Sequence, residues 1–181
     1  MPHLISACVV DSLRKDAGTI GVTAIDKRPV AGPVKVRDLG LFADLQADRK
    51  HHGGENKALY AYAQEDADYW QSQLGRDLPP GWFGENLRVA GVDVTNSRVG
   101  ERWRIGETVE VEVTMPRSPC ATFARWVGGA DARGWVKRFA NEGRLGAYLR
   151  VIQIGSISPG DPLELLFVPT DAQTILEMFR A

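Results

Sequence analysis

The stretch TVEVEVTMPRSPC, residues 108–120, decides how the rest of the chain is interpreted. Its first half alternates β-branched or apolar residues with polar ones, which predicts a β-strand over Thr108–Thr114 with one buried face. Pro116 is expected to stop that strand, because proline cannot donate a hydrogen bond to a sheet ladder. The stretch therefore predicts a strand that ends at Pro116 and is followed directly by the start of a helix.

The end of this stretch places a cysteine beside a cation. Ser118 is a favoured N-cap residue and Pro119 suits the first helical position, so we expect a short helix over Ala121–Val127. Cys120 would lie in its first turn, where free backbone N–H groups, the helix dipole and Arg117 all favour a thiolate. A thiolate is a nucleophile or a soft-metal ligand. A buried structural cysteine is the alternative, and local chemistry alone does not choose between the two.

Composition indicates a soluble globular protein. The 181 residues suffice for one domain with a hydrophobic core, and 44% hydrophobic with 25% charged residues is ordinary for this class. We expect no membrane span, and Met1–Val10 lacks the basic region of a secretory signal. The net charge of −1 gives no field for a nucleic-acid backbone, so we expect no nucleic-acid partner and local binding of any anion.

The two cysteines, Cys8 and Cys120, are too few for a disulfide framework. We therefore expect a reducing, cytoplasmic location, with a disulfide between them as the lesser alternative.

Short strands separated by glycine and proline dominate the remaining pattern, which predicts a mainly β (α+β) fold with a barrel-like sheet and peripheral helices. Strands are expected over 4–10, 19–25 (paired with the first), 34–36, 58–63, 82–89, 99–105, 108–114, 148–157 and 163–168. A loop is expected over 27–35. Helices are expected over 64–74, 131–141 and 171–180, ending at Gly75 and Gly143 for the first two and capped by Thr170 for the third.

A polar loop, KHHGGENK over residues 50–57, is a second candidate site. Its two glycines expose backbone N–H groups between Lys50 and Lys57, an arrangement suited to an anionic group, although it is not a phosphate loop. Adjacent histidines on extended chain face opposite ways, so His51 and His52 are not expected to bind one metal together. A solvated loop would have the same composition.

The segment FGENL, residues 83–87, is a third candidate. Glu85 and Asn86 lie between apolar neighbours, and buried polar groups need partners. A surface strand explains these residues equally well.

The three segments together resemble the signature of the MOSC domain family in residue type, order and spacing. The matching residues are His52-Gly53-Gly54 with Lys57, Phe83-Gly84-Glu85-Asn86-Leu87 and Arg117-Ser118-Pro119-Cys120. The resemblance covers about residues 18–166. With the fuller DRKHHGG stretch, it extends to the bacterial stand-alone branch that resembles reductases of N-hydroxylated compounds.

This resemblance implies a single MOSC domain over 1–181, a distorted β-barrel and a bound molybdenum cofactor, with no pyridoxal phosphate expected. Cys120 would be the protein ligand of the metal and the catalytic residue, since soft sulfur suits a molybdenum centre. The family motifs also imply that further residues line the cofactor site: His52, Gly53, Lys57, Glu85, Asn86 and Arg117. Lys57 and Arg117 would contact the cofactor phosphate, and Glu85 and Asn86 the pterin ring edge.

The implied activity is reduction of N-hydroxylated base analogues or hydroxylamines, in a detoxifying role. Electrons would come from a separate donor protein, because two cysteines cannot hold a four-cysteine iron–sulfur cluster. Alternatives are a persulfide-bearing sulfur carrier and a cofactor-binding module without turnover. A cysteine hydrolase using His51 or His52 is least favoured, because nothing places a third orienting residue. Monomer and homodimer both fit the sequence.

Overall fold

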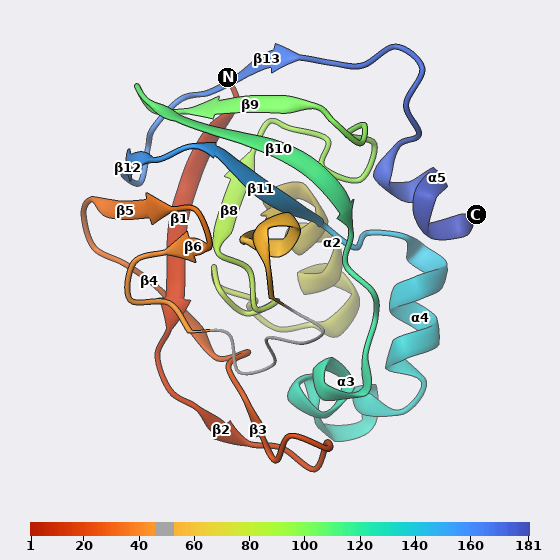
Figure 1. The fold of residues 1–181 in the computed structure, drawn as a ribbon. Helices are drawn as coiled ribbons and strands as arrows, with labels where there is room; N and C mark the ends of the chain where they lie inside the picture. Colours follow the sequence, from red (N-terminus) through yellow and green to blue (C-terminus); the bar gives the residue numbers. More distant parts are fainter. Residues whose placement is uncertain (46–52) are drawn as a thin grey trace.

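The computed structural model describes residues 1–45 and 53–181 (Figure 1), and its main feature is an eight-stranded sheet. Strands β7 and β8 are parallel, and the other neighbouring pairs are antiparallel. In spatial order the strands are β13 (Leu163–Phe167), β9 (Arg102–Ile105), β10 (Val109–Pro116), β11 (Ala147–Gln153), β7 (Leu59–Ala63), β8 (Leu87–Ala90), β1 (His3–Val10) and β4 (Lys27–Pro29).

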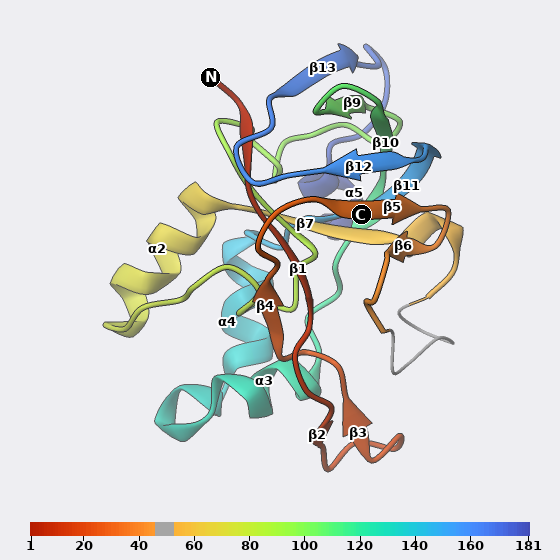
Figure 2. The same ribbon diagram turned by 90° about the vertical axis from the view of Figure 1, so that its left-hand side faces the viewer.

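Two smaller sheets complete the β-structure. One orders β12 (Gly155–Ile157), β5 (Val34–Arg37) and β6 (Gly40–Leu41), and the other is the ribbon of β2 (Arg14–Lys15) and β3 (Val22–Thr23). Figure 2 shows the β2–β3 ribbon projecting beyond the main sheet, at the same end as the helices α3 (Ala121–Val127) and α4 (Trp135–Glu142). The mixed α+β, mainly sheet architecture is as expected.

The expected closure into a barrel is not confirmed. Among the described strands, the two ends of the order, β13 and β4, do not pair with each other. An isolated bridge joins His3 to Pro162, next to β13. Beside this bridge the Leu163 N–H donates to the Pro2 carbonyl and the Leu4 N–H to the Asp161 carbonyl, but among the described residues the contact does not extend into a ladder between β1 and β13.

Two hydrophobic clusters lie on opposite faces of β7, because its side chains alternate. Leu59 and Ala61 belong to an aliphatic cluster, whereas Tyr60 and Tyr62 belong to an aromatic cluster shared with the helices. The aromatic cluster includes Trp70 of α2 (Gln64–Leu74). The cavity described below lies at the edge of this aromatic cluster.

Several expected elements form as predicted. Helix α2 spans Gln64–Leu74 and ends at Gly75, which has a left-handed conformation and donates its N–H to the Gln71 carbonyl. Helix α3 spans Ala121–Val127, and α4 ends at Gly143. The β9–β10 hairpin turns at 106–108.

Several predictions of elements are wrong. The segment 19–25 is a strand only at Val22–Thr23 and pairs with β2, while β1 pairs with β4, in the segment expected to be a loop. Residues 79–84 form turns, with Gly84 N–H donating to the Gly81 carbonyl, so the strand expected over 82–89 starts at Leu87. The strand expected over 148–157 divides into β11 and β12, which pair in different sheets.

Two further errors concern helix starts. The C-terminal helix α5 (Ile175–Arg180) is capped by Thr174, whose hydroxyl accepts from the Glu177 N–H while the Glu177 carboxylate accepts from the Thr174 N–H, so Thr170 is not the cap. The helix expected over 131–141 divides into a 3-10 turn, η2 (Gly129–Ala132), and α4. No helix of the described residues is long and apolar enough to cross a membrane.

Candidate functional site

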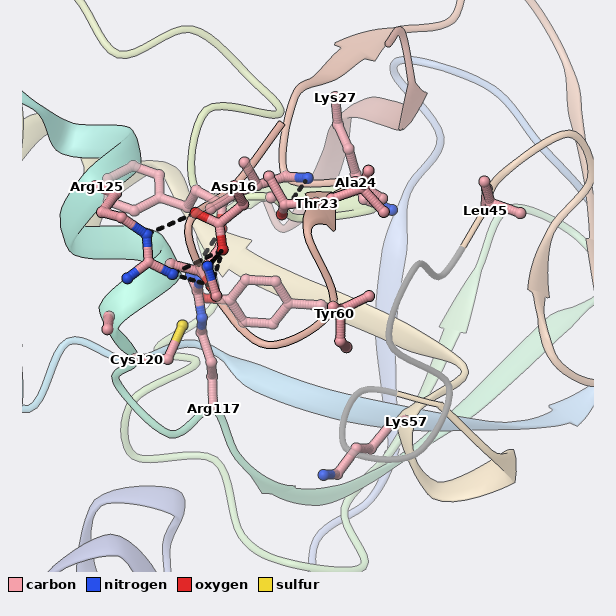
Figure 3. A pocket seen from close by; sticks show the side chains of 18 of the residues that line it. Asp16, Thr23, Ala24, Lys27, Leu45, Lys57, Tyr60, Arg117, Cys120 and Arg125 are labelled. Carbon is pink, nitrogen blue, oxygen red and sulfur yellow. Dashed lines mark hydrogen bonds and ion pairs between the residues drawn. The ribbon is translucent and has the colours of Figure 1, made fainter. Parts of the chain in front are cut away.

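A cavity of about 390 Å³ brings together distant parts of the chain (Figure 3). Its walls come from the β2–β3 ribbon, β7, the turn before β8, the start of α3 and β11. Four predicted site residues line it: Lys57, Asn86, Arg117 and Cys120. Gly53 and Glu85 are described but do not line the cavity, and His51 and His52 lie outside the described residues.

Cys120 is the N-cap residue of α3, not a residue of its first turn as expected. Its backbone is extended, with φ −139° and ψ 160°, and its carbonyl accepts from the Ala124 N–H at 3.2 Å. The thiol is free and partly exposed to the cavity, beside Arg117 in Figure 3. The other cysteine, Cys8, is also free and fully buried, and this burial raises the pKa of its thiol. Cys120 is thus the cysteine available to a ligand.

Arg117 is a buried cation in the cavity wall, 6% exposed. Its Nη1 donates to the Phe83 carbonyl at 2.7 Å and to the Tyr60 hydroxyl at 3.4 Å. Its guanidinium centre lies 4.3 Å from the centroid of the Phe123 ring, a cation–π contact.

The Arg117 guanidinium is positively charged. Burial by itself lowers the pKa of Arg117, but Tyr60, Tyr148 and Cys120 reverse this and hold the pKa above its ordinary value. Within the described part of the chain, no carboxylate pairs with this guanidinium. A buried positive charge without a carboxylate favours an anionic ligand beside it.

Lys57 adds a second cation to the same cavity. It ends the 3-10 turn η1 (Glu55–Lys57), and its Nζ lies 5.5 Å from the centroid of the Tyr148 ring. The Tyr148 and Tyr60 rings are 5.4 Å apart, and burial raises the pKa of both hydroxyls, so both tyrosines are neutral. The site therefore combines cations with neutral aromatic surfaces.

Asn86 connects three segments. Its Oδ1 accepts from the Tyr60 N–H at 3.1 Å, and its Nδ2 donates to the Asp44 carboxylate at 2.7 Å and to the Cys8 carbonyl at 3.3 Å. The same Asp44 oxygen accepts from Lys27 Nζ in a buried ion pair. Lys27 lines the cavity, and the sequence reasoning missed both it and Asp44. No local pattern marks this pair, because both residues lie far from Asn86 in the sequence.

Glu85 holds the turn before β8. Its Oε1 accepts from the Gly81 N–H at 2.7 Å and from Arg88 Nε at 2.8 Å, and both charged side chains are fully buried. Its Oε2 has no hydrogen-bond partner among the described residues. The expected contact of Glu85 with a pterin ring stays a prediction, since the geometry gives this carboxylate a different role.

Arg125 is a further cation that the sequence reasoning missed. It lies on α3, lines the cavity, and donates from Nε and Nη2 to the Asp16 carboxylate at 2.6 and 2.7 Å. The bonds from Arg125, together with the Thr122 hydroxyl and the Gly18 N–H, lower the pKa of Asp16 to about 2. Asp16 lies between β2 and β3, and its partners on α3 are more than a hundred positions away in the sequence.

These features define a class of protein: an α+β domain that presents the free thiol of Cys120 beside buried positive charge, in a cavity large enough for an organic anion. No cluster of three or more metal-ligating side chains of the His, Cys, Asp or Glu type occurs in residues 1–45 and 53–181.

Comparison with known proteins specifies the family. The MOSC domain model matches residues 48–164, and the chain belongs to the MOSC domain family, which is associated with molybdenum-cofactor binding. It is 39% identical over 144 residues to the uncharacterized protein YflK of Bacillus subtilis and 34% identical over 148 residues to the protein YiiM of Escherichia coli. Each match covers 80% of this chain, but only 63% and 64% of those relatives.

A protein called Reductase from Gibberella moniliformis is 30% identical over 165 residues, which are 87% of this chain and 28% of that protein. Among solved structures, YiiM from Geobacillus stearothermophilus matches with a TM-score of 0.77 at 29% identity, over 99% of this chain and 83% of the other. YiiM from Escherichia coli matches with a TM-score of 0.72 at 26% identity, over 99% and 76%.

Proposed function

We propose that this protein is a molybdenum-cofactor-dependent reductase of N-hydroxylated compounds. The observation that carries the proposal is the buried guanidinium of Arg117 beside the Cys120 thiol on one cavity wall. The family and the Gibberella moniliformis relative called Reductase support a reductase related to this cofactor.

The residues present fit the cofactor chemically. Its phosphate needs cations, and Lys57 and Arg117 both line the cavity. Its flat pterin suits aromatic walls such as Tyr60 and Tyr148, and its soft metal suits the sulfur of Cys120. When bound, the group supplies a metal centre that passes two electrons to an N–O bond.

Other residues take supporting parts in this proposal. Asn86 lines the cavity and forms hydrogen bonds with Tyr60 and Asp44, and we propose that it also contacts the cofactor. We also propose that Gly53 and His52 approach the cofactor, and that Glu85 acts by fixing the turn that carries Phe83 and Asn86.

The proposed reaction is R–NHOH + 2 e⁻ + 2 H⁺ → R–NH₂ + H₂O, in which the N–O bond breaks and the oxygen leaves as water. In this proposal the electrons come from a separate donor protein. The chain's own part is to ligate the metal through Cys120 and to bind the anionic group through Arg117 and Lys57. We further propose that residues 1–181 act as one MOSC domain in the cytoplasm, as monomer or homodimer.

The test is reduction of an N-hydroxylated purine base by protein expressed with full molybdenum supply, using a chemical reductant as donor. We expect turnover by the wild type and a loss of about a hundredfold or more in Arg117→Met, whose apolar side chain removes the buried cation. Val168→Met, at an exposed site outside the cavity, is the control. Equal activity of Arg117→Met and wild type would overturn the proposed site.

The same preparation tests the sulfur-carrier alternative. A persulfide on Cys120 would add about 32 Da to the protein, and reductant would remove it. Such an adduct without any turnover of the purine base would replace the reductase with a sulfur carrier.

A further inference from the structure

The β2–β3 ribbon, residues 14–23, is a small structure of its own. Its ladder has only the pairs Arg14–Thr23 and Lys15–Val22, and it forms a sheet separate from the main one. Isolated two-stranded ribbons are marginal in water. The ribbon therefore depends on side-chain contacts to keep its place.

Asp16 supplies the main contact, with α3. Its carboxylate accepts two hydrogen bonds from Arg125, at 2.6 and 2.7 Å, and one from the Thr122 hydroxyl at 3.0 Å. It also accepts from the Gly18 N–H at 3.1 Å, which fixes the ribbon's own turn. Because Cys120 is the N-cap residue of α3, this carboxylate ties the ribbon to the helix that presents the thiol.

At its base the ribbon has a second contact. Arg14 donates from Nε to Asp26 at 2.6 Å and lies over the Trp126 ring of α3, 5.4 Å from its centroid. The two contacts hold the β2 side of the ribbon against α3 and Asp26.

The ribbon and the residues after it form the apolar wall of the cavity. Thr19, Ile20 and Val22 line it, and Ala24 and Ile25 continue the same wall. Ile20 and Val22 are 47% and 40% exposed, so much of their apolar surface remains for a ligand to cover. In the view of Figure 3, Asp16, Thr23 and Ala24 lie above the cationic residues Arg117 and Lys57.

We propose that the β2–β3 ribbon selects the substrate: Ile20 and Val22 contact the organic body of the N-hydroxylated compound, and Asp16 is the positioning residue that fixes them. The choice of substrate rests on the proposed function, whereas the attachment of the ribbon by Asp16 does not. The ligand class is an N-hydroxylated molecule with a planar apolar body, in preference to hydroxylamine itself.

Selectivity is tested with the double variant Ile20→Thr/Val22→Thr, which keeps β-branched side chains and removes apolar surface. We expect KM for an N-hydroxylated purine base to rise about tenfold with little change in kcat. The kcat/KM for hydroxylamine, which has no organic body, should stay within about twofold of wild type. Leu13→Thr, at a similarly exposed aliphatic residue outside the cavity lining, is the matched control. Equal effects on both compounds would overturn the selectivity proposal.

The positioning role of Asp16 has a readout that needs no cofactor. In Asp16→Asn we expect hydrogen–deuterium exchange of the amides in 14–23 to become about tenfold faster, with β7 and β10 unchanged. The control is Asp11→Asn, which changes an exposed carboxylate just before the ribbon. In the loaded enzyme, Asp16→Asn should also raise KM for the purine base and not for hydroxylamine.

The two proposals fail separately. If wild type reduces neither compound, the proposed function and the selectivity role fall together, and the attachment of the ribbon is judged by exchange alone. Unchanged exchange in Asp16→Asn would overturn the positioning role whatever the activity.

Discussion

Asp44 shows how one residue can hold several parts of the cavity. Its carboxylate accepts from Lys27 Nζ and Asn86 Nδ2, and it also accepts from the Val10 N–H at 2.9 Å. The Lys27 and Asp44 side chains are only 9% and 7% exposed. Asp44→Ala leaves a buried ammonium without its partner, so we expect the free energy of unfolding in urea to fall by about 3 kcal/mol or more.

The exposed ion pair of Arg104 and Glu164, at 3.3 Å with 38% and 66% exposed side chains, provides the control. Glu164→Ala should lower the free energy of unfolding by less than about 1 kcal/mol, because solvent screens the pair. Similar losses of unfolding free energy in Asp44→Ala and Glu164→Ala would contradict the claim that burial makes the Lys27–Asp44 ion pair important for stability.

Asp16 predicts a dependence of stability on pH. The bonds from Arg125, Thr122 and Gly18 lower its pKa from 3.8 to about 2 in the folded protein. A carboxylate with a depressed folded pKa stabilises the protein above its unfolded pKa, and this contribution is lost as pH falls from about 4 to about 2. The difference in unfolding free energy between wild type and Asp16→Asn should therefore shrink across that interval. A difference that does not change with pH would contradict the assignment.

At the residue scale, the motifs located part of the site. Four of the predicted residues line the cavity: Lys57, Asn86, Arg117 and Cys120. They were predictable because cations, an amide and a thiol next to turns or a helix start are residue types that bind ligands. Asp16, Lys27 and Asp44 were missed because their roles depend on partners far away in the sequence. Only the fold creates those pairs.

At the element scale, the turn before β8 must approach β4 closely, and Gly81 permits this. Gly81 has φ +92°, and a Cβ built there would lie 2.3 Å from the Lys27 carbonyl oxygen. Gly160 has the same φ of +92° with nothing within 4 Å of such a Cβ. Gly81→Ala should therefore reduce the unfolding free energy by at least about 2 kcal/mol more than Gly160→Ala, as measured by urea denaturation. Equal losses would mean that the backbone angle alone matters at Gly81.

Elements with strong local signals were predictable, and those fixed by distant pairing were not. Helix α2 has apolar residues at helical spacing and a terminal glycine, and both signals lie within the segment. By contrast, β1 pairs with β4 instead of 19–25, a choice that depends on the whole sheet. The turns over 79–84 were hidden because Trp82 and Phe83 have strand propensity, while Glu85 accepting from the Gly81 N–H favours a turn.

At the scale of the whole molecule, the mixed α+β class and the MOSC family followed from the sequence, but the closed barrel did not. Among the described strands, β1 approaches the start of β13 through the isolated His3–Pro162 bridge without forming a ladder, and no local pattern encodes how far a pairing between such distant segments extends. The cavity likewise exists only in the assembled fold, since its walls come from the N-terminal ribbon, the central strands and α3.

The central claim, that Cys120 ligates molybdenum in a bound cofactor, is tested most directly by the molybdenum content of purified protein expressed with full cofactor supply. We expect near-stoichiometric molybdenum and released pterin in wild type and in Cys8→Ala, since Cys8 is fully buried. Cys120→Ser should lose most of the metal, because a hydroxyl is a poor ligand for a soft centre. Metal content in Cys120→Ser equal to wild type, or no metal and no pterin in wild type, would contradict the account.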